Sequence, residues 1–318
     1  MNRHIFVAGH QGMVGSAIIR RLSADSEINI ITASRNQCDL TNQNDVLDFI
    51  QNNRIDEVYI AAARVGGIKA NSENQYEFLY ENLMIESNLI NACYINGIKK
   101  LLFLGSSCIY PKHSKQPIKE EALLSDYLEP TNQGYALAKI SGIKMCEYIS
   151  QESNFDYRSI MPTNLYGPND NYHLENSHVI PGLIHKFYNA KKNSTDVMVW
   201  GSGDPLREFL HVDDLARAAI FINNVDQKTY LDCINNDVSH LNVGSGEEVS
   251  IKELAIMMSE IFNFDGKIKF DIKKPDGMKR KLLDCSRLLS LGWHPEIDLR
   301  SGLKSTIAEF KALKESNL

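Results

Sequence analysis

A tyrosine and a lysine four residues apart are the side chains of this sequence best suited to proton transfer. Tyr135 and Lys139 open a helical pattern that runs to about residue 149, so the two side chains share one face of the helix. Ser106 follows an apolar run at residues 101–104 that is typical of a buried strand. Since an ammonium favours the phenolate, Lys139 would lower the pKa of Tyr135, while the Ser106 hydroxyl would hold a substrate oxygen. These groups fit protonation of a ketone or sugar oxygen.

The Tyr-x-x-x-Lys spacing alone is not specific, because Tyr188 and Lys192 repeat it without a preceding strand that ends in serine. The alternative for Tyr135 and Lys139 is an ordinary pair on a helix surface. The glycines near the N-terminus favour the catalytic interpretation.

Three of these glycines, Gly9, Gly12 and Gly15, lie between a predicted strand and a helical pattern over residues 14–22. Glycines at such a junction permit a tight turn and a close approach of the backbone to a pyrophosphate, which the helix N-terminus faces. The alternative is a structural turn that binds no nucleotide. Because this is the first strand–helix junction of an alternating chain, it favours a dinucleotide site.

The end of the second predicted strand, residues 28–33, indicates which dinucleotide binds. An acidic residue here usually bonds the ribose 2′-hydroxyl of NAD, whereas an arginine accommodates the 2′-phosphate of NADP. Arg35 follows this strand with no acid beside it, so NADP is favoured over NAD. A solvated surface arginine is the alternative. Asp39 would contact the adenine or help to cap the following helix.

Strand and helix patterns alternate through residue 165, which predicts a right-handed, doubly wound parallel sheet of the α/β Rossmann class. A loop rich in proline and glycine at residues 162–168 follows the last of these strands, where such folds bind ligands. We therefore expect an NADP-binding domain over residues 1–165. Residues 166–318 would form mainly a smaller α/β lobe for the substrate, with segments near residues 205–245 returning to the first domain.

Composition excludes several functions. The 318 residues are 43% apolar and 23% charged, as in ordinary globular proteins, and the net charge of −6 argues against a nucleic-acid or anionic membrane surface. No apolar run approaches a membrane span, and a strand pattern begins at once with no signal peptide, so we expect a cytoplasmic protein. The six cysteines include no Cys-x-x-Cys pair, which predicts neither a metal site nor disulfides. Cys108 differs, because it lies two residues beyond Ser106.

A long helical pattern at about residues 76–96 carries apolar residues on more than one side. This favours burial against both the sheet and a second subunit, and hence a homodimer. The alternative is that these apolar residues form one wide helix face that packs only against the core of the same chain.

These motifs together resemble the extended short-chain dehydrogenase/reductases that act on nucleotide sugars. The order is GxxGxxG, Ser with YxxxK, PTNLYGP and REFLHVDD. Within that family, LGSSCIYPK, SHVIPGLIHKF and VWGSGDPLREFLHVDDLA are similar to the members that epimerise C3 and C5 of a GDP-4-keto-6-deoxy sugar and then reduce C4. Cys108 and His178 are the specific markers, because ordinary 4-epimerases do not need this acid/base pair.

The resemblance implies a role for each reacting group. Tyr135 would protonate the C4 oxygen as NADPH delivers hydride, Lys139 would hold the nicotinamide ribose, and Ser106 would bond the 4-keto oxygen. That carbonyl acidifies the protons at C3 and C5, where Cys108 would act as base and His178 as acid. Without its sequence context, His178 would more often be a helix cap or a core residue.

The resemblance also implies two sets of binding residues. Lys186, Trp200, Arg207 and Asp276 would hold the GDP-sugar, although Trp200 has the alternative of a core position and Lys186 that of a solvated helix charge. The positions implied to contact NADP(H) are Gly9, His10, Gln11, Gly12, Met13, Val14, Gly15, Arg35, Asp39, Leu40, Leu104, Gly105, Ser106, Ser107, Lys139, Pro162, Thr163, Asn164, Leu165 and His178.

Three other functions remain open. The same chemistry could act on a 3-deoxy sugar, the chain could be an NAD-dependent nucleotide-sugar 4-epimerase, or it could be a non-catalytic NADP sensor. Arg35 and the pair Cys108 and His178 weigh against the epimerase. The presence of Ser106, Tyr135 and Lys139 weighs against the sensor.

Overall fold

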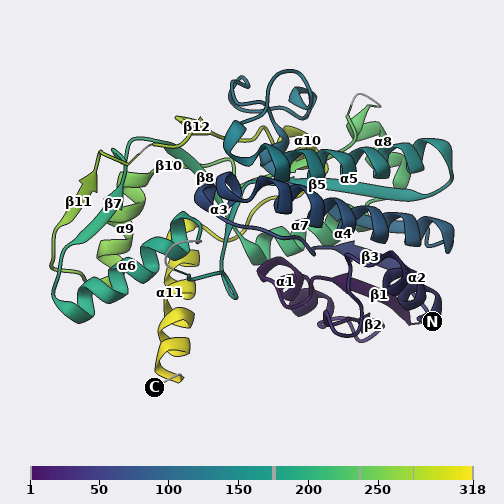
Figure 1. Ribbon diagram of the computed structural model, residues 1–318, viewed down its shortest axis with the longest axis horizontal. Helices are drawn as coiled ribbons and strands as arrows, with labels where there is room; N and C mark the ends of the chain where they lie inside the picture. The colour runs from purple at the N-terminus through teal and green to yellow at the C-terminus, as the bar shows by residue number, and fades with distance from the viewer. Residues whose placement is uncertain (1, 174–176, 236–237, 275, 317–318) are drawn as a thin grey trace.

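Two parts of unequal size make up the molecule in the computed structural model, which describes residues 2–173, 177–235, 238–274 and 276–316. Figure 1 shows the larger part on the right, with the N-terminus, and the smaller part on the left, from which the C-terminal helix projects. Among the described residues, no helix combines the length and the apolar character that a membrane crossing needs.

A six-stranded parallel sheet forms the centre of the larger part, in the order β2-β1-β3-β4-β5-β9. This confirms the predicted doubly wound α/β class. The strand order reverses beside β1, and doubly wound folds bind ligands at such a point, beyond the carboxyl ends of the strands. The strands are β1 Arg3–Ala8, β2 Ile28–Ile31, β3 Glu57–Ile60, β4 Lys100–Leu104, β5 Asp156–Pro162 and β9 Leu241–Val243.

Helices cover both faces of this sheet, because alternate residues of each strand point to opposite sides. In β4, Leu101 and Phe103 join the core beneath α2, α4 and α5, whereas Leu102 and Leu104 join the core beneath α1 and α7. The helices of the larger part are α1 Met13–Leu22, α2 Gln43–Asn52, α3 Ile68–Glu73, α4 Gln75–Ile95, α5 Gln133–Glu152, α7 Val212–Asn224, α8 Gln227–Ile234 and α10 Ser286–Ser290, with single 3₁₀ turns at Ser107–Ile109, Glu120–Ala122 and Pro130–Asn132.

The smaller part has two small sheets and its own apolar core. Strand β8 pairs with β6, β10 and β12, while β7 pairs with β11. Helices α6, α9 and α11 pack over them through a core that includes Phe187, Met258 and Phe310. The elements are β6 Asn164–Tyr166, α6 Val179–Asn193, β7 Val197–Trp200, β8 Leu206–His211, β10 Glu248–Ser250, α9 Ile251–Phe262, β11 Ile268–Asp271, β12 Arg280–Lys281 and α11 Leu299–Ser316.

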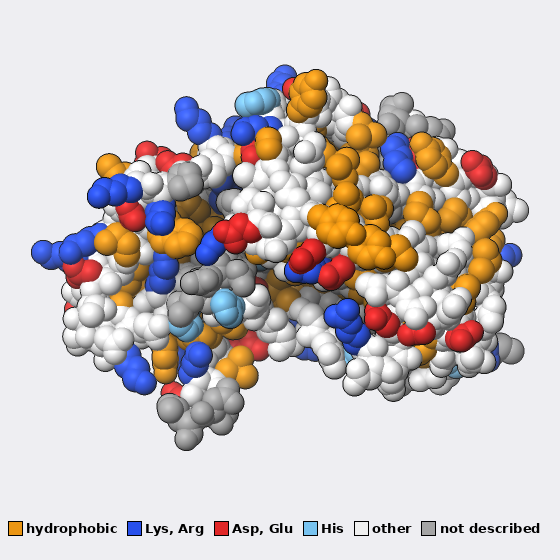
Figure 2. Space-filling view, in the orientation of Figure 1, with side chains coloured by type: hydrophobic (Ala, Val, Ile, Leu, Met, Phe, Trp, Pro, Cys, Tyr) orange, Lys and Arg blue, Asp and Glu red, His pale blue; other side chains and the backbone are white. Residues whose placement is uncertain are grey.

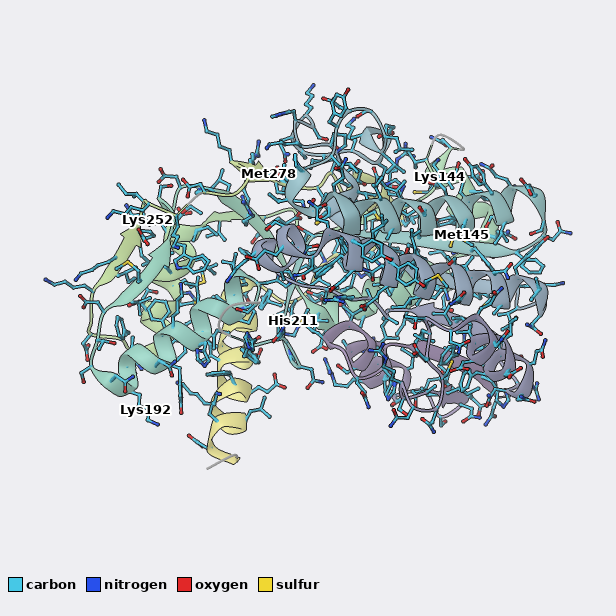
Figure 3. The ribbon with its side chains drawn as sticks, in the orientation of Figure 1. Lys144, Met145, Lys192, His211, Lys252 and Met278 are labelled. Carbon is cyan, nitrogen blue, oxygen red and sulfur yellow. The ribbon has the colours of Figure 1, made fainter. Side chains whose placement is uncertain are left out.

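The chain passes between the two parts repeatedly. After β8 it returns to the larger part, where α7 packs on α1 and β9 extends the main sheet beside β5. It then supplies α9 and β11 to the smaller part, α10 to the larger and α11 to the smaller. His211, labelled in Figure 3, ends β8 where the two parts meet.

Candidate active site

The glycine turn after β1 brings backbone into close contact. Gly9 has a φ of +84°, and a Cβ there would lie 2.6 Å from the backbone nitrogen of Ala62 at the end of β3. A Cβ on Gly15 would collide with the carbonyl oxygen of Gly9, so glycine also lets α1 pack against the turn. The N-terminus of α1 therefore opens toward the ends of the strands, where it can face an anion.

A cleft of about 560 Å³ lies beside this turn and has the place and size of a dinucleotide site. Arg35 is exposed in its wall, next to Asp39 and Leu40. The Asp39 carboxylate accepts bonds from the backbone and hydroxyl of Thr41, whereas Asn42 is the residue that caps α2. The capping alternative for Asp39 is therefore wrong, and Asp39 shapes the cleft wall. Gly9, His10, Gln11 and Gly12 line the cleft as well.

Two acids and an arginine that sequence reasoning missed also belong to this region. Arg64 lines the cleft, contacts Glu81 and lies 2.6 Å from a carboxylate oxygen of Glu77. Its guanidinium lies over the ring of Phe78, which in turn meets the ring of Tyr135 edge-on. The signal in the sequence was weak, because Arg64 follows the third strand in no motif with an assigned role.

Ser106 and Cys108 lie on one tight turn at the carboxyl end of β4. The Ser106 hydroxyl accepts a 3.2 Å bond from the backbone of Cys108, which fixes the 3₁₀ turn Ser107–Ile109. Both side chains are partly exposed, while Leu104, Gly105 and Ser107 are buried behind them. A hydroxyl and a thiol thus face the same space, two residues apart.

Tyr135 reaches this turn from the first turn of α5. Gly134 lets the start of α5 pack against the start of α4, because a Cβ there would collide with the Gln75 carbonyl, and its N–H donates to the Gln75 side chain at 3.0 Å. Burial, and then the charges of Cys108 and Glu86, raise the pKa of Tyr135, while its hydrogen bond with Ser106 lowers it. The net direction is the opposite of the one expected from Lys139, because burial of the phenol is the largest of these effects.

Lys139 is buried, with 2% of its surface exposed, and its ammonium is already engaged. Its Nζ lies 2.7 Å from Glu86 Oε1, donates to the Leu104 carbonyl at 3.0 Å, and lies 4.7 Å from the centre of the Phe103 ring. The centre of the Tyr135 ring is farther away, at 5.8 Å. The Glu86 carboxylate therefore offsets the positive charge of Lys139, which would otherwise stabilise the phenolate form of Tyr135.

His178 lies at the start of α6, where its side chain makes no capping bond and is exposed to solvent. It occupies the N-cap position of α6 without capping through its side chain, and it is not a core histidine. Many protein atoms lie near the ring although solvent reaches it, and this partial desolvation, followed by the charge of Lys281, lowers the pKa of the ring. Lys281 also lies 3.8 Å from the Cys108 thiol. The same ammonium therefore acts on both side chains that are expected to exchange protons with the substrate.

The predicted substrate residues gather in the smaller part. Arg207 in β8 is the register partner of Lys281 in β12, so the two cations lie on neighbouring strands. Burial lowers the pKa of Arg207, and the Asp276 carboxylate opposes this shift. Asp276 itself accepts bonds from the backbone and hydroxyl of Ser202 at 2.9 and 2.8 Å.

Trp200 is not a core residue, because 55% of its surface is exposed. Lys186 and Lys274 place their ammonium groups 5.0 and 5.4 Å from the centre of its ring. Lys186 also donates to the Met198 carbonyl at 3.0 Å, and burial lowers its pKa, so it is not a freely solvated helix charge. An exposed indole between two cations is suited to stacking on a base beside a phosphate.

The remaining predicted cofactor contacts lie beyond the cleft. Pro162 ends β5, Thr163 bonds the Val243 carbonyl, Asn164 bonds the Glu208 carbonyl at 2.8 Å, and Leu165 lies in β6. Met13 and Val14 begin α1 and pack against the apolar core beneath α1 and α7. Among the residues with described positions, no three His, Cys, Asp or Glu side chains are grouped closely enough to hold a metal ion.

Fold and site define a class. The chain belongs to the NAD dependent epimerase/dehydratase family, whose family model matches residues 5–232. Within it, the chain is similar to GDP-L-fucose synthase of Escherichia coli K12, at 51% identity over 97% of this chain and 96% of the relative. A GDP-L-colitose synthase of Yersinia pseudotuberculosis is 38% identical over 98% of this chain and 99% of its own. A GDP-L-fucose synthetase of Naegleria fowleri, solved bound to NADP, is 27% identical and superposes with a TM-score of 0.88 over 99% of this chain and 96% of its own.

Proposed function

We propose that this protein converts GDP-4-keto-6-deoxy-D-mannose to GDP-L-fucose, by epimerisation at C3 and C5 followed by NADPH-dependent reduction at C4. The observation that carries the proposal is that Ser106, Cys108 and Tyr135 face one another at the end of β4. The cleft lined by the glycine turn and Arg35 lies at the same edge of the sheet, at the carboxyl ends of β1 and β3. The 51% identity to a GDP-L-fucose synthase across nearly the whole chain supports it.

The cofactor is NADP(H). Arg35 stands in the cleft where a 2′-phosphate would lie, and the similar Naegleria fowleri enzyme binds NADP. NADPH supplies the hydride that reaches C4. The chain's own part is to orient the 4-keto oxygen with the Ser106 hydroxyl and to give that oxygen the proton of Tyr135, which yields the alcohol. Lys139 would hold the nicotinamide ribose beside them.

Epimerisation uses the same carbonyl before it is reduced. Withdrawal of electrons by the 4-keto group acidifies the protons at C3 and C5, and Cys108 removes each proton as a thiolate to leave an enolate. His178 returns a proton to the opposite face of the carbon, which inverts the centre. Binding of an anionic diphosphate near Lys281 would offset the charge that now disfavours protonated His178.

The GDP-sugar extends from this centre into the smaller part. Arg207 and Lys281 hold the diphosphate on neighbouring strands, and Lys186 assists them. Trp200 stacks on the base, and Asp276 accepts from the nucleotide or the sugar. Residues 1–165 thus mainly bind the cofactor and residues 166–318 mainly the substrate, with the return of the chain to the main sheet described above.

The working form is a homodimer that associates through α4 and α5. Apolar side chains are exposed along both helices at helical spacing, including Tyr76 and Tyr80 on α4 and Leu137 and Tyr148 on α5. Figure 2 shows hydrophobic side chains gathered over this face of the larger part, and Figure 3 labels Met145 on the same helix as Tyr148. A second copy would remove this surface from water. We assign the dimer to the cytoplasm.

A second candidate is GDP-L-colitose synthesis, in which a 3-deoxy sugar replaces the 6-deoxymannose. The 38% identity to a colitose synthase over almost the full length of both chains favours it as the alternative. The colitose reaction needs the same groups for epimerisation at C5 and reduction at C4. The two reactions would differ in the pocket residues that contact C3 and its hydroxyl.

The deciding experiment supplies purified protein with NADPH and GDP-4-keto-6-deoxy-D-mannose, follows NADPH absorbance, and identifies the product sugar by NMR. Consumption of NADPH with a GDP-6-deoxy-L-galactose product is the expected result. Consumption with only the 3-deoxy analogue would transfer the assignment to the colitose reaction. Tight NADPH binding with no turnover of either sugar would overturn both.

A further inference from the structure

Glu86 lies in the middle of α4, belongs to no motif, and is almost fully buried, with 1% of its surface exposed. Its Oε1 lies 2.7 Å from the Lys139 ammonium. A buried carboxylate is costly unless it is paired, and burial indeed raises the pKa of Glu86 while Lys139 lowers it. The fold therefore keeps the Glu86 carboxylate buried at a cost in stability. This carboxylate contacts Lys139, the lysine one helical turn from Tyr135.

The packing of α5 makes room for this carboxylate. Gly142 lies one turn beyond Lys139, and a Cβ there would lie 2.9 Å from Glu86 Oε2 and 2.5 Å from the ring of Phe103. Only glycine leaves space for both groups. The ammonium of Lys139 is thus held between the Glu86 carboxylate, the Leu104 carbonyl and the Phe103 ring. Two independent features thus fix the position of the Lys139 ammonium: its ion pair with Glu86, and the absence of a side chain at Gly142.

The titratable groups around this arrangement come from several elements. Tyr135 is faced by Cys108 from the turn after β4 and by Glu86 from α4, and Lys281 of β12 lies beyond Cys108. Behind the ion pair, Cys146 of α5 and Cys93 of α4 are buried thiols, and Glu86 and Cys93 both raise the pKa of Cys146. Lys139 is the cation in contact with Glu86.

We propose, in a refinement that rests on the proposed function, that Glu86 is a positioning residue that holds the Lys139 ammonium and offsets its charge, so that the Tyr135 phenol stays protonated until C4 is reduced. An enzyme that interconverts alcohol and ketone needs a tyrosine that can also remove a proton. An enzyme that only reduces needs a tyrosine that begins as an acid. A protonated phenol also bonds the 4-keto oxygen while Cys108 removes the C3 and C5 protons, and so supports both steps.

The direct test titrates Tyr135 in the complex with NADP⁺, without substrate. Tyrosinate absorbance near 295 nm is recorded against pH, and the curve of the matching Tyr135→Phe protein is subtracted to isolate this phenol. Glu86→Gln keeps the shape of the side chain and removes its charge. We expect the ionisation of Tyr135 to move down by about one pH unit or more in the Gln variant. Coinciding curves, or an upward shift, would overturn the inference.

A kinetic test uses the same variant at saturating NADPH and GDP-4-keto sugar. The basic limb of the kcat profile should move to lower pH in Glu86→Gln, with KM for the sugar changed less than twofold. A merely structural role predicts a uniform loss of kcat at every pH and an unmoved limb. If the wild-type protein consumed no NADPH with either sugar, the proposed function would fail, while the absorbance titration would still decide the role of Glu86.

Matched controls keep the test independent of folding. Glu147→Gln removes a carboxylate from the surface of α5, where it pairs with Lys144, and should leave the Tyr135 titration unchanged. If Glu86→Gln fails to fold, Glu86→Asp draws the carboxylate back from the ammonium, and we expect a smaller downward shift in the same titration. An Asp variant that folds and titrates like the wild type would equally contradict the proposal.

Discussion

The Lys281 ammonium lies 3.8 Å from the Cys108 thiol, although 173 residues separate them in the chain. The contact exists because β12 pairs in parallel with β8 and thereby delivers Lys281 to the end of β4, where Cys108 lies. The ammonium is thus a charged hydrogen-bonding partner of the sulfur that we propose removes a proton from carbon.

Lys281→Met should therefore slow the exchange of solvent deuterium into C3 and C5 of the substrate by about tenfold or more, because the sulfur loses a charged hydrogen-bonding partner. NADPH affinity should change less than twofold, because the contact lies away from the cofactor cleft. Exchange is measured by NMR with GDP-4-keto-6-deoxy-D-mannose in D₂O. Lys279→Met, two residues away on the same segment, is the control, and equal slowing in both variants would remove Lys281 from the reaction.

Tyr135→Phe should abolish most of the reduction and spare much of the epimerisation. Loss of the proton donor to the C4 oxygen is expected to cost about 10²- to 10⁴-fold in NADPH consumption. Deuterium exchange at C3 and C5 should be slowed much less than reduction, because it loses the bond from Tyr135 to the 4-keto oxygen but keeps Ser106 and Cys108. Tyr188→Phe is a matched control, because Tyr188 has the same spacing to a lysine but packs against Phe310 in the smaller part. Full reductase activity in Tyr135→Phe would refute the assignment.

Arg35→Ala should weaken NADPH binding by about 10- to 100-fold and leave NADH binding nearly unchanged, because only NADPH carries the 2′-phosphate. Fluorescence titration of both cofactors measures the two affinities directly. Arg54→Ala, which removes an exposed arginine outside the residues that line the cleft, should change neither. Equal losses for NADPH and NADH would mean that Arg35 does not contact the phosphate.

Acid sensitivity should depend on His240, which is fully buried and whose pKa burial lowers to about 3. Its ring lies 2.8 Å from the Tyr110 hydroxyl. A histidine with a depressed folded pKa contributes stability above the unfolded value of about 6.5, and that stability is lost as pH falls toward 3. For this residue the loss between pH 7 and pH 5 is about 2 kcal/mol.

The check is chemical denaturation of His240→Gln and wild type at both pH values. The variant should be less stable at pH 7, where the bond to Tyr110 is lost, yet its unfolding free energy should fall by about 2 kcal/mol less between pH 7 and pH 5. His113→Gln, at an exposed position, should follow the wild type. Parallel losses in all three proteins would show that His240 does not govern the acid response.

Leu137→Glu should convert the proposed dimer to a monomer, because it places a charge in the apolar face that α4 and α5 expose. Light scattering after size-exclusion chromatography measures the mass in solution. Ile256→Glu, a similar change at an exposed position of α9, should leave the mass unchanged. A wild-type monomer, or a dimer that tolerates Leu137→Glu, would exclude this face as the interface.

The fold could be predicted because its signals are local. The apolar run at 101–104 and the helical pattern after Tyr135 correspond to β4 and to α5, which the structure extends to Glu152. Strand β2 ends at Ile31 rather than near residue 33, because it is an edge strand whose pairing with β1 stops there. The position of β9 in the main sheet could not be predicted from local signals, because its pairing with β5 joins segments about 80 residues apart.

The site could be predicted only where its residues lie in motifs. Ser106, Tyr135 and Lys139 have a recognisable spacing, whereas Glu86 and Lys281 have none. Glu86 lies in a helix that also carries Glu77 and Glu81, and it differs from them in its burial and in the packing of α4 against Gly142. The pKa of Tyr135 differs from the expected direction because the sequence reveals the ammonium of Lys139 but neither the burial of the phenol, which raises the pKa most, nor the Glu86 carboxylate.

The repeated passage of the chain between the two parts limits how such enzymes can be recombined. The smaller part is assembled from β6 and β8, then from α9 and β11, and finally from α11, with segments of the larger part between them. A single crossover near residue 165 would therefore transplant α7, β9 and α10 of the donor along with its sugar pocket. Exchange of substrate preference between relatives should succeed through substitutions within the pocket, and chimaeras joined at one point should misassemble the main sheet.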